Sequence, residues 1–338
     1  MHARVYSDKD TTLRPLRGKT LGVIGYGSQG RAQALNLNDR GLAMIIGLRP
    51  KSRSRAAARK DGFAVYTAAE VARRADILFL ALPDMAIPRV FEREIAPHLR
   101  KGQTLLFAHG FAIFYRTITP PPDVDIVMVA PKGLGPMVRR EFVAGRGAPA
   151  LIAVAQNASG RAQKTALAWA KAIGSARAGV IETTFREETE TDLFGEQAVL
   201  CGGMTALVRA GFETLVEAGY PAELAYFECL HELKFIVDLM HEEGIAGMRA
   251  SISETAKWGD LTVGPKIIDA RVKKAMAAQL RRIQSGGFAE GWLRESETGR
   301  RRYDKLLAAG AAHSIERTGE RLRALTSWSA PARTRRGR

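Results

Sequence analysis

Short apolar runs alternate with helical segments through the first half of the 338-residue chain. The runs have the length of strands and cover residues 20–24, 43–47, 76–82, 104–108, 125–130 and 151–155. Helical segments fall between several of them, including residues 30–39, 54–61, 68–74 and 159–173. Most of the runs are apolar throughout, as expected for strands that are covered on both faces. This βαβ alternation predicts an α/β fold with a doubly wound parallel sheet.

The pattern changes near residue 183. From Thr184 onward no run is convincing as a strand, and long helical periods dominate, most clearly over 187–217, 222–243 and 269–284. We therefore expect an α/β domain over residues 1–183 and an all-helical domain over residues 184–329. The last residues, 330–338, are rich in arginine and are expected to form a disordered basic tail.

The chain is strongly basic, with 51 lysine and arginine residues against 35 aspartate and glutamate residues, a net charge of +16. Outside the tail the basic residues are scattered. No recognised nucleic-acid motif and no basic stripe with interleaved aromatic residues accompanies them. We expect a solvated surface that attracts anionic metabolites, without a nucleic-acid partner.

Other features of the sequence bear on where the protein works. The longest apolar runs are far shorter than a membrane span, and the first residues contain no stretch like that of a signal peptide. The two cysteines, Cys201 and Cys229, have no spacing that indicates a disulfide framework. We expect a cytoplasmic protein without a membrane segment.

A glycine-rich loop follows the strand over residues 20–24. Its six residues have the spacing G-x-G-x-x-G, open a helix, and are Gly25, Tyr26, Gly27, Ser28, Gln29 and Gly30. Such a loop lets backbone N–H groups approach a pyrophosphate at the positive end of the helix. The pattern predicts a dinucleotide site. The alternative is a glycine-rich turn that only packs the helix onto the strand.

The end of the second strand indicates which dinucleotide binds. NAD-binding chains usually place an aspartate or glutamate there, to hold the ribose hydroxyls. This chain has no acid there, and instead Arg49, Ser52 and Ser54 follow the strand. A guanidinium and two hydroxyls can hold a 2′-phosphate, so we expect NADPH. The alternative is an exposed basic loop without a ligand.

Two pairs of carboxylates lie four residues apart in the helical half. The pairs are Asp192 with Glu196, and Glu228 with Glu232. Each pair shares a helix face with apolar residues, so we expect these acids to be buried. Four buried carboxylates without cysteine or histidine ligands suit one or two Mg²⁺ ions. The alternative is that the acids reach solvent or form salt bridges.

Two further polar side chains directly follow predicted strands. His109 comes after the run 104–108, and Lys132 comes after the run 125–130. The carboxyl ends of strands line the ligand crevice of a doubly wound sheet, where both side chains can face a nicotinamide and a substrate. A lone histidine in such a place is structural as often as it is catalytic.

Taken together, these motifs resemble the ketol-acid reductoisomerase family over about residues 3–328. The strings that carry the resemblance are Gly25–Gly30, Ala108–Phe111, Val129–Gly133, Glu187–Gln197, Glu228–Lys234 and Ser251–Ser253. The resemblance implies the short-chain form of the enzyme, with a Rossmann domain and a knotted helical domain. It also places Asp84 and Gly135 in the cofactor site.

The resemblance further implies an obligate homodimer, alone or within a higher assembly, in which two chains share each active site. Asp192 would bridge two Mg²⁺ ions, with Glu196 on one ion and Glu228 and Glu232 around the other. Glu228, Glu232 and Ser253 would come from the second chain, and Ser253 would hold the substrate carboxylate.

The implied reaction belongs to valine, isoleucine and leucine biosynthesis. A magnesium-dependent alkyl migration in 2-acetolactate, or in 2-aceto-2-hydroxybutanoate, would precede reduction by NADPH to a 2,3-dihydroxy-3-methyl acid. Lys132 would stabilise developing oxyanion charge, and His109 would serve proton transfer. Two alternatives stay open: a metal-independent 3-hydroxyacid dehydrogenase, and a catalytically silent NADP-binding or RNA-binding relative.

Overall fold

The computed structural model describes residues 3–325, so the predicted basic tail at 330–338 lies outside the described residues. The chain divides into two compact units, Met1–Thr191 and Asp192–Arg338. The division falls inside one helix, α8 (Phe185–Gly195), which begins directly after the boundary expected at 183/184. Helix α8 therefore belongs to both units, and each unit is described by itself below.

The first unit is built on one nine-stranded sheet with the order β1-β9-β8-β7-β6-β5-β2-β3-β4. Its strands are β1 (Val5–Tyr6), β2 (Thr20–Ile24), β3 (Ala43–Gly47), β4 (Ala64–Tyr66), β5 (Ile77–Leu80), β6 (Thr104–Phe107), β7 (Asp125–Pro131), β8 (Ala150–Gln156) and β9 (Val180–Glu182). The six predicted strands are all present, and the strands from β2 to β7 run parallel, which confirms the predicted α/β class. The strand order reverses at β2, whose neighbours are β3 and β5, and a crevice that binds ligands is typical of such a position.

Strand β8 differs from the predicted parallel pattern, because it pairs antiparallel with β7. The segment between the two strands contains α6 (Gly135–Val143) and leaves and re-enters the sheet at the same edge, so β8 must run in the opposite direction. Strand β1 also pairs antiparallel, with β9 at the end of the sheet.

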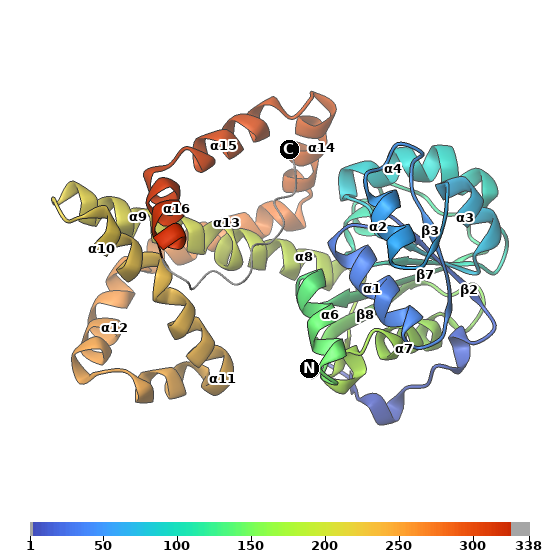
Figure 1. The fold of residues 1–338 in the computed structure, drawn as a ribbon, viewed down its shortest axis with the longest axis horizontal. Helices are drawn as coiled ribbons and strands as arrows, with labels where there is room; N and C mark the ends of the chain where they lie inside the picture. The colour runs from blue at the N-terminus through green and yellow to red at the C-terminus, as the bar shows by residue number, and fades with distance from the viewer. Residues whose placement is uncertain (1–2, 326–338) are drawn as a thin grey trace. The chain divides into compact units, whose positions relative to one another are not determined.

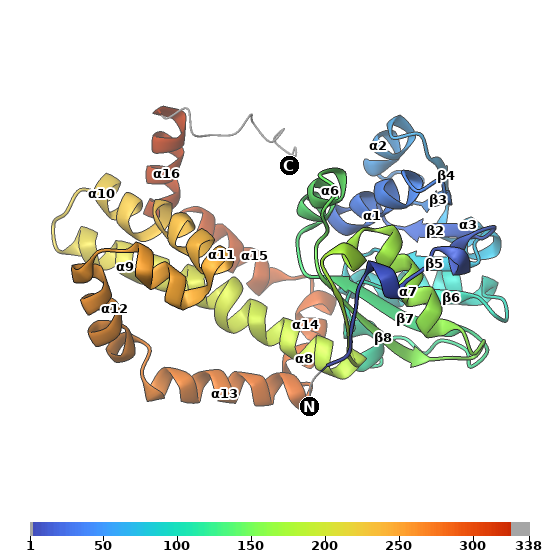
Figure 2. The same ribbon diagram turned by 90° about the horizontal axis from the view of Figure 1, so that it is seen from below.

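Helices cover both faces of the sheet (Figures 1 and 2). In the first unit they are α1 (Ser28–Asn38), α2 (Ser54–Lys60), α3 (Ala68–Arg74), α4 (Ile87–Val90), α5 (Phe111–Phe114), α6 and α7 (Ala162–Ala172). Ile77 and Phe79 of β5 belong to a core that includes α1 and α7. Leu78 and Leu80 of the same strand belong to a second core, which includes α3 and α4. This alternation along one strand explains why the predicted strands are apolar throughout.

Trp169 of α7 anchors the first of these cores. Its side chain is fully buried, its ring contacts Phe79 edge-on at 5.7 Å, and its Nε1 donates a hydrogen bond of 2.8 Å to Gln33 Oε1. We expect Trp169→Ala to lower the free energy of unfolding by about 3–5 kcal/mol, because it leaves a cavity and an unpaired amide. Urea denaturation of the full chain measures this. Trp169→Phe should cost less, and equal losses for the two variants would mean that the cavity is not the cause.

The second unit is helical throughout its described part, as predicted. After the end of α8 come α9 (Gly202–Glu217), α10 (Ala222–Tyr226), α11 (Leu233–Ser251), α12 (Glu254–Ile267), α13 (Ala270–Gln284), α14 (Gly287–Glu297), α15 (Arg301–Ala311) and α16 (Ser314–Leu325). Their one buried cluster in the described residues is small and consists of Val208, Phe212, Ala225, Tyr226 and Ile315. Gly319 lets α16 approach α10, since a Cβ at this position would lie 2.5 Å from the Tyr226 ring.

Many large apolar side chains of the second unit are exposed in the single chain. They include Val199, Leu200, Leu207, Leu224, Phe235, Ile245, Trp258, Leu261, Val263, Ile267, Ile268, Leu306 and Leu307. The exposed fraction is 65% for Leu200, 53% for Phe235 and 71% for Trp258. One helical run, Phe185–Glu217, is also long and apolar enough to cross a membrane by length and composition alone. An exposed apolar surface of this size is typical of a face that another molecule covers.

Candidate active site

The glycine loop at the carboxyl end of β2 combines close packing with an open position. Gly25 has a φ of +101°, and a Cβ there would lie 2.3 Å from the carbonyl oxygen of Ala81. A Cβ at Gly30 would lie 2.5 Å from the carbonyl oxygen of Gly25. At Gly27, in contrast, a Cβ would meet no atom within 4 Å. Two of the glycines therefore pack the turn, while the third leaves space above the start of α1, where a phosphate group can approach.

Two hollows lie beside this loop, along the carboxyl ends of the strands. The larger has a volume of about 710 Å³, and its lining includes Gly25, Tyr26, Gly27, Arg49, Ser52 and Ser54. The smaller has a volume of about 300 Å³, and its lining includes Gly27, Ser28, Gln29, Asp84 and His109. Because Gly27 lines both, the hollows follow one another from the basic loop to His109. This arrangement suits an extended dinucleotide.

The basic loop after β3 is held by its own chain. Arg55 Nη1 donates a hydrogen bond of 2.9 Å to the carbonyl oxygen of Leu48, and the Ser54 N–H donates to Ser52 Oγ at 3.3 Å. Arg49 is exposed and forms no ion pair among residues 3–325. Its guanidinium is therefore available to an anionic ligand.

Several predicted cofactor residues make contacts within the protein. The Tyr26 hydroxyl donates a hydrogen bond of 2.7 Å to Asp61, and burial followed by this contact raises the pKa of Tyr26, which keeps the phenol neutral. Gln29 Nε2 donates to the carbonyl oxygen of Gly133 at 2.8 Å. The Gly135 N–H donates to Ser28 Oγ at 3.2 Å. These contacts fix the loop after β7 against the start of α1.

A buried carboxylate, Glu188 of α8, connects the two predicted catalytic residues. Its side chain is 1% exposed. His109 Nδ1 lies 3.1 Å from Oε2, Lys132 Nζ lies 3.3 Å from Oε1, and the Gly110 N–H donates to Oε2 at 3.0 Å. The close approach depends on glycine, since a Cβ at Gly110 would lie 2.2 Å from Thr189 Oγ1. Glu188 thus holds His109 and Lys132 together beyond the ends of β6 and β7.

The electrostatics of Glu188 favour its ionised form. Burial acts to raise its pKa, but hydrogen bonds from His109 and Gly110 and the charges of His109 and Lys132 outweigh burial and lower the pKa. A buried carboxylate with several donors remains charged at neutral pH. It can therefore hold an ammonium group and orient an imidazole at the same time.

The four predicted metal ligands are less buried in the single chain than expected. Glu196, Glu228 and Glu232 are exposed, and Asp192 is half-buried, so the prediction of burial is wrong for one chain by itself. The reason is that the apolar residues on the same helix faces, such as Leu200 and Phe235, are exposed as well. No three of the four acids form a cluster of ligand atoms among residues 3–325.

Asp192 nevertheless has a defined place, one turn after Glu188 on helix α8. Ligand atoms of His109, Glu188 and Asp192 lie within 4.8 Å of one another. In the helical unit, the residues after α8, Glu196–Leu200, form a π-helical turn, and another one over Phe227–His231 contains Glu228. Such turns are often associated with functional sites. The two long helices that the sequence predicted are therefore interrupted at candidate ligands.

Ser253, the predicted substrate residue, lies at the amino end of α12. Its side chain accepts a hydrogen bond of 3.2 Å from the Ala256 N–H and is exposed. The hydroxyl proton is not used by this contact, so Ser253 can still donate to an anionic group.

Comparison with known proteins identifies the family to which this arrangement belongs. Residues 15–179 match the family "Acetohydroxy acid isomeroreductase, NADPH-binding domain", and residues 185–328 match "Ketol-acid reductoisomerase, C-terminal domain". The ketol-acid reductoisomerase (NADP(+)) of Saccharopolyspora erythraea is 56% identical over 329 residues, which cover 97% of this chain and 99% of the relative. The chain belongs to the ketol-acid reductoisomerase family.

It is an NADP-dependent ketol-acid reductoisomerase of branched-chain amino-acid biosynthesis, as the sequence motifs predicted. An NADH-preferring ketol-acid reductoisomerase from an uncultured archaean superposes with a TM-score of 0.94 at 44% identity, covering 96% of this chain and 99% of that one. A semialdehyde dehydrogenase NAD-binding protein from Cupriavidus necator has a TM-score of 0.60 at 20% identity and is similar in fold alone, covering 78% of this chain and 99% of its own. Membership of this family excludes the alternative that the chain is a 3-hydroxyacid dehydrogenase.

Glu188 is the residue of this reductoisomerase site that sequence reasoning missed. It lies four residues before Asp192, which in turn lies four residues before Glu196, so one periodic series contains all three acids. This signal was obscured because Glu188 stands in an acidic run with Glu187 and Glu190. Only the structure separates them: Glu187 is exposed and accepts hydrogen bonds from Thr183 and Thr184, Glu190 is buried but pairs with Arg186, and Glu188 is buried against His109 and Lys132.

Proposed function

We propose that this reductoisomerase converts 2-acetolactate, or 2-aceto-2-hydroxybutanoate, to a 2,3-dihydroxy-3-methyl acid by a magnesium-dependent alkyl migration and a reduction with NADPH. The observation that carries the proposal is the buried Glu188, which contacts both His109 and Lys132. A carboxylate that holds a histidine and a lysine in this way suits a reaction in which negative charge develops on a substrate oxygen and protons are transferred.

The residues present fit NADPH. Gly27 leaves open space above the amino end of α1 for the pyrophosphate, and Arg49 is available to the 2′-phosphate together with Ser52 and Ser54. The adjoining hollow that contains His109 then receives the nicotinamide. Bound there, NADPH supplies the hydride for the reduction.

The chemistry of the acidic side chains fits Mg²⁺. Oxygen ligands are what this ion prefers, and we assign Asp192, Glu196, Glu228 and Glu232 to two ions in each site. The π-helical turns at Glu196 and Glu228 support the assignment. Bound there, Mg²⁺ supplies Lewis-acid activation of the substrate oxygens.

His109 and Lys132 act on the substrate from the first unit. The Lys132 ammonium stabilises negative charge that develops on the substrate oxygen during the alkyl migration. His109 contacts Glu188 through Nδ1, so its Nε2 is the nitrogen placed for proton transfer. Glu188 is a positioning residue in this mechanism, since it orients the imidazole and keeps the ammonium in place.

A second copy of the chain completes the site. The exposed apolar side chains beside the candidate ligands, such as Leu200 and Phe235, need cover, and a symmetric dimer provides it without a different partner. In this dimer Glu228, Glu232 and Ser253 reach the site of the other chain, and dimers can assemble further. We also place the enzyme in the cytoplasm, consistent with its free cysteines.

A preference for NADPH over NADH by at least about tenfold is expected, since charge-assisted contacts contribute about 1.5–3 kcal/mol each. Arg49→Ala should remove most of this preference, because it should raise the KM for NADPH and leave the KM for NADH nearly unchanged. Steady-state kinetics with both cofactors measure the effect. Lys51→Ala is the matched control, because Lys51 is in the same loop but does not line the larger hollow. Equal KM values for the two cofactors in the unmodified enzyme would contradict the assignment.

Product analysis tests the proposed substrates. Purified enzyme is incubated with NADPH, Mg²⁺ and either 2-acetolactate or 2-aceto-2-hydroxybutanoate, and mass spectrometry follows the acids. The proposal requires the matching 2,3-dihydroxy-3-methyl acid, with one NADPH consumed for each molecule formed. Oxidation of NADPH without this acid would exclude the proposed reaction.

A further inference from the structure

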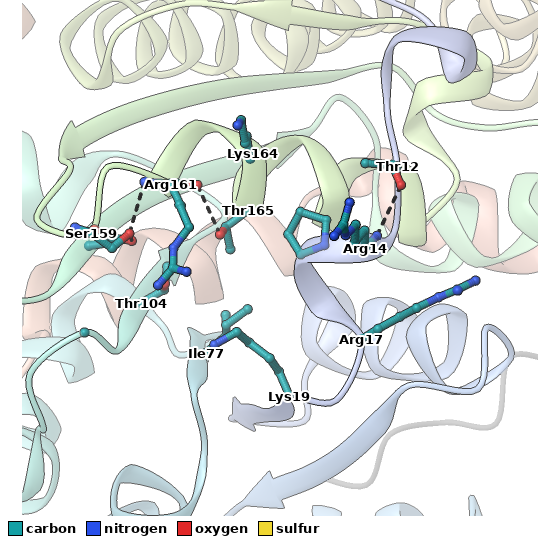
Figure 3. A pocket seen from close by; sticks show the side chains of 13 residues that line it. Thr12, Arg14, Arg17, Lys19, Ile77, Thr104, Ser159, Arg161, Lys164 and Thr165 are labelled. Carbon is teal, nitrogen blue, oxygen red and sulfur yellow. Dashed lines mark hydrogen bonds between the residues drawn. The ribbon is translucent and has the colours of Figure 1, made fainter.

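A third hollow lies at the opposite edge of the sheet, at the amino ends of the strands. Its volume is about 600 Å³, within the range of roughly 300–1,000 Å³ that is typical of small-molecule sites. Figure 3 shows its lining, which comes from the segment before β2, from the starts of β5, β6 and β7, and from the start of α7. The glycine loop and His109 lie at the other ends of these strands, so this hollow is distinct from the cofactor site.

The floor of the hollow is buried and mostly polar. Thr104, Asp125 and Thr165 are between 2% and 7% exposed. Asp125 is fully engaged, since the Ser159 N–H donates to its Oδ1 at 2.9 Å and the Ser159 hydroxyl donates to its Oδ2 at 2.6 Å. Each oxygen of its carboxylate thus accepts a hydrogen bond from Ser159.

Five basic side chains surround the floor: Arg14, Arg17, Lys19, Arg161 and Lys164. Among residues 3–325, none of these five side chains forms an ion pair or a hydrogen bond. Lys171, on the same helix as Lys164, provides the contrast, because it forms an ion pair of 2.8 Å with Asp8. Five basic side chains thus line a hollow that contains one carboxylate, and Figure 3 shows Arg161 extending over it; such a surface concentrates anions.

The start of α7 adds positive potential to the same place. Helix amino ends favour acidic residues, because the helix dipole is positive there. The first turn of α7 contains no acid, and Arg161 precedes its first residue while Lys164 is its third. In Figure 3 the Arg161 side chain extends from the helix start toward Thr104. The basic side chains and the helix dipole repel one another here, and a bound anion would be attracted to both.

We propose that this hollow binds a small polyanion that carries two or more phosphate groups. Two phosphates match the positive charge better than a carboxylate or a single phosphate does, and guanidinium groups suit phosphate oxygens. A hollow with a closed floor at the sheet edge fits a compact metabolite rather than a nucleic-acid strand, which needs an extended surface. The proposal is independent of the reductoisomerase reaction, and so is its test.

Isothermal titration calorimetry with inorganic tripolyphosphate tests the proposal. The enzyme is saturated with NADPH, so that the cofactor site is filled, and Mg²⁺ is left out because it binds the probe. We expect one tripolyphosphate per chain. The double variant Lys19→Gln/Arg161→Gln should weaken binding by at least about tenfold, the size expected for lost charge-assisted contacts.

Arg140→Gln is the matched control, because Arg140 is an exposed arginine of the same unit that does not line the hollow. It should change binding less than twofold, and Lys164→Gln serves as a second test if the double variant does not fold. The proposal is overturned if no heat of binding appears, if NADPH abolishes it, or if the double variant binds like the control. Displacement of the probe by a single-stranded RNA that binds more tightly would also overturn it.

Discussion

Replacing Glu188 with glutamine is expected to lower kcat by about a thousandfold, equivalent to about 4 kcal/mol in the activation barrier. The amide keeps the size of the side chain but removes the buried negative charge that holds His109 Nδ1 and Lys132 Nζ. Lys132 then loses its orientation, and the substrate oxygen loses its stabilising charge. Steady-state turnover of 2-acetolactate with saturating NADPH and Mg²⁺ measures the loss.

Glu187→Gln is the control for this experiment. Glu187 is adjacent on α8, but it is exposed and contacts Thr183 and Thr184 rather than the site. We expect it to retain at least half of the turnover. Glu188→Gln should also bind NADPH within about threefold of the unmodified enzyme, because the cofactor contacts lie elsewhere. If Glu188→Gln kept more than about a tenth of the turnover, a barrier change below about 1.4 kcal/mol, Glu188 would have no positioning role.

The lowered pKa of Glu188 adds a dependence of stability on pH in the metal-free enzyme. Hydrogen bonds and the charges of His109 and Lys132 hold the pKa of Glu188 in the folded chain below its value in the unfolded chain. The stabilisation by the charged form is therefore complete above that value and is lost as the pH falls through the folded pKa. The stability difference between the unmodified enzyme and Glu188→Gln should be largest above about pH 5 and should shrink in acid. A difference that does not change with pH would mean that Glu188 is not ionised.

The second large effect concerns the metal ligands and the dimer. Asp192→Asn and Glu228→Gln should each abolish turnover while NADPH binding stays nearly intact. Asp192→Asn should cost more if Asp192 is a ligand of both ions, since an amide has only one oxygen to offer. If the two acids come from different chains, each mixed dimer has one site with both lesions and one site with neither. Refolding the two inactive chains together should therefore restore activity.

The expected size of the recovery follows from the symmetry of the proposed dimer. With random pairing about half of the dimers are mixed, and half of their sites are intact, so activity should return to about a quarter. Mass spectrometry of the intact dimers establishes that mixing has occurred. Each variant refolded with itself is the control and should stay inactive. Mixed dimers without activity would mean that each chain builds its own metal site.

Much of the fold is predictable because the sheet is covered on both faces. Continuous apolar runs such as those of β5 and β7 are typical of strands buried on both sides, and the glycine loop has a defined place between β2 and α1. Three short strands, β1, β4 and β9, were not predicted, since runs of two or three residues are too short for a periodic signal. The antiparallel pairing of β8 with β7 was not predicted, because the direction of a strand depends on where the chain re-enters the sheet.

The sequence offered candidate site residues, but it indicated neither Glu188 nor the arrangement of the site. His109 and Lys132 could be proposed because each follows a strand, whereas their contact with Glu188 depends on how α8 packs against the Gly110 loop. The π-helical turn at Glu228 could not be predicted, since sequence periodicity does not distinguish it from an α-helical turn. The predicted burial of the acids failed for the single chain because the helical unit leaves its apolar faces without cover.

The oxidation of NADPH in the presence of 2-acetolactate, with and without Mg²⁺, tests the central claim most directly. The claim is that an NADP-dependent reduction is coupled to a metal-dependent alkyl migration at the Glu188 site. We predict oxidation of NADPH with Mg²⁺ present, loss of at least about 99% of the rate after chelation, and full recovery when Mg²⁺ is added back. The same rate with and without Mg²⁺, at saturating substrate, would contradict the account.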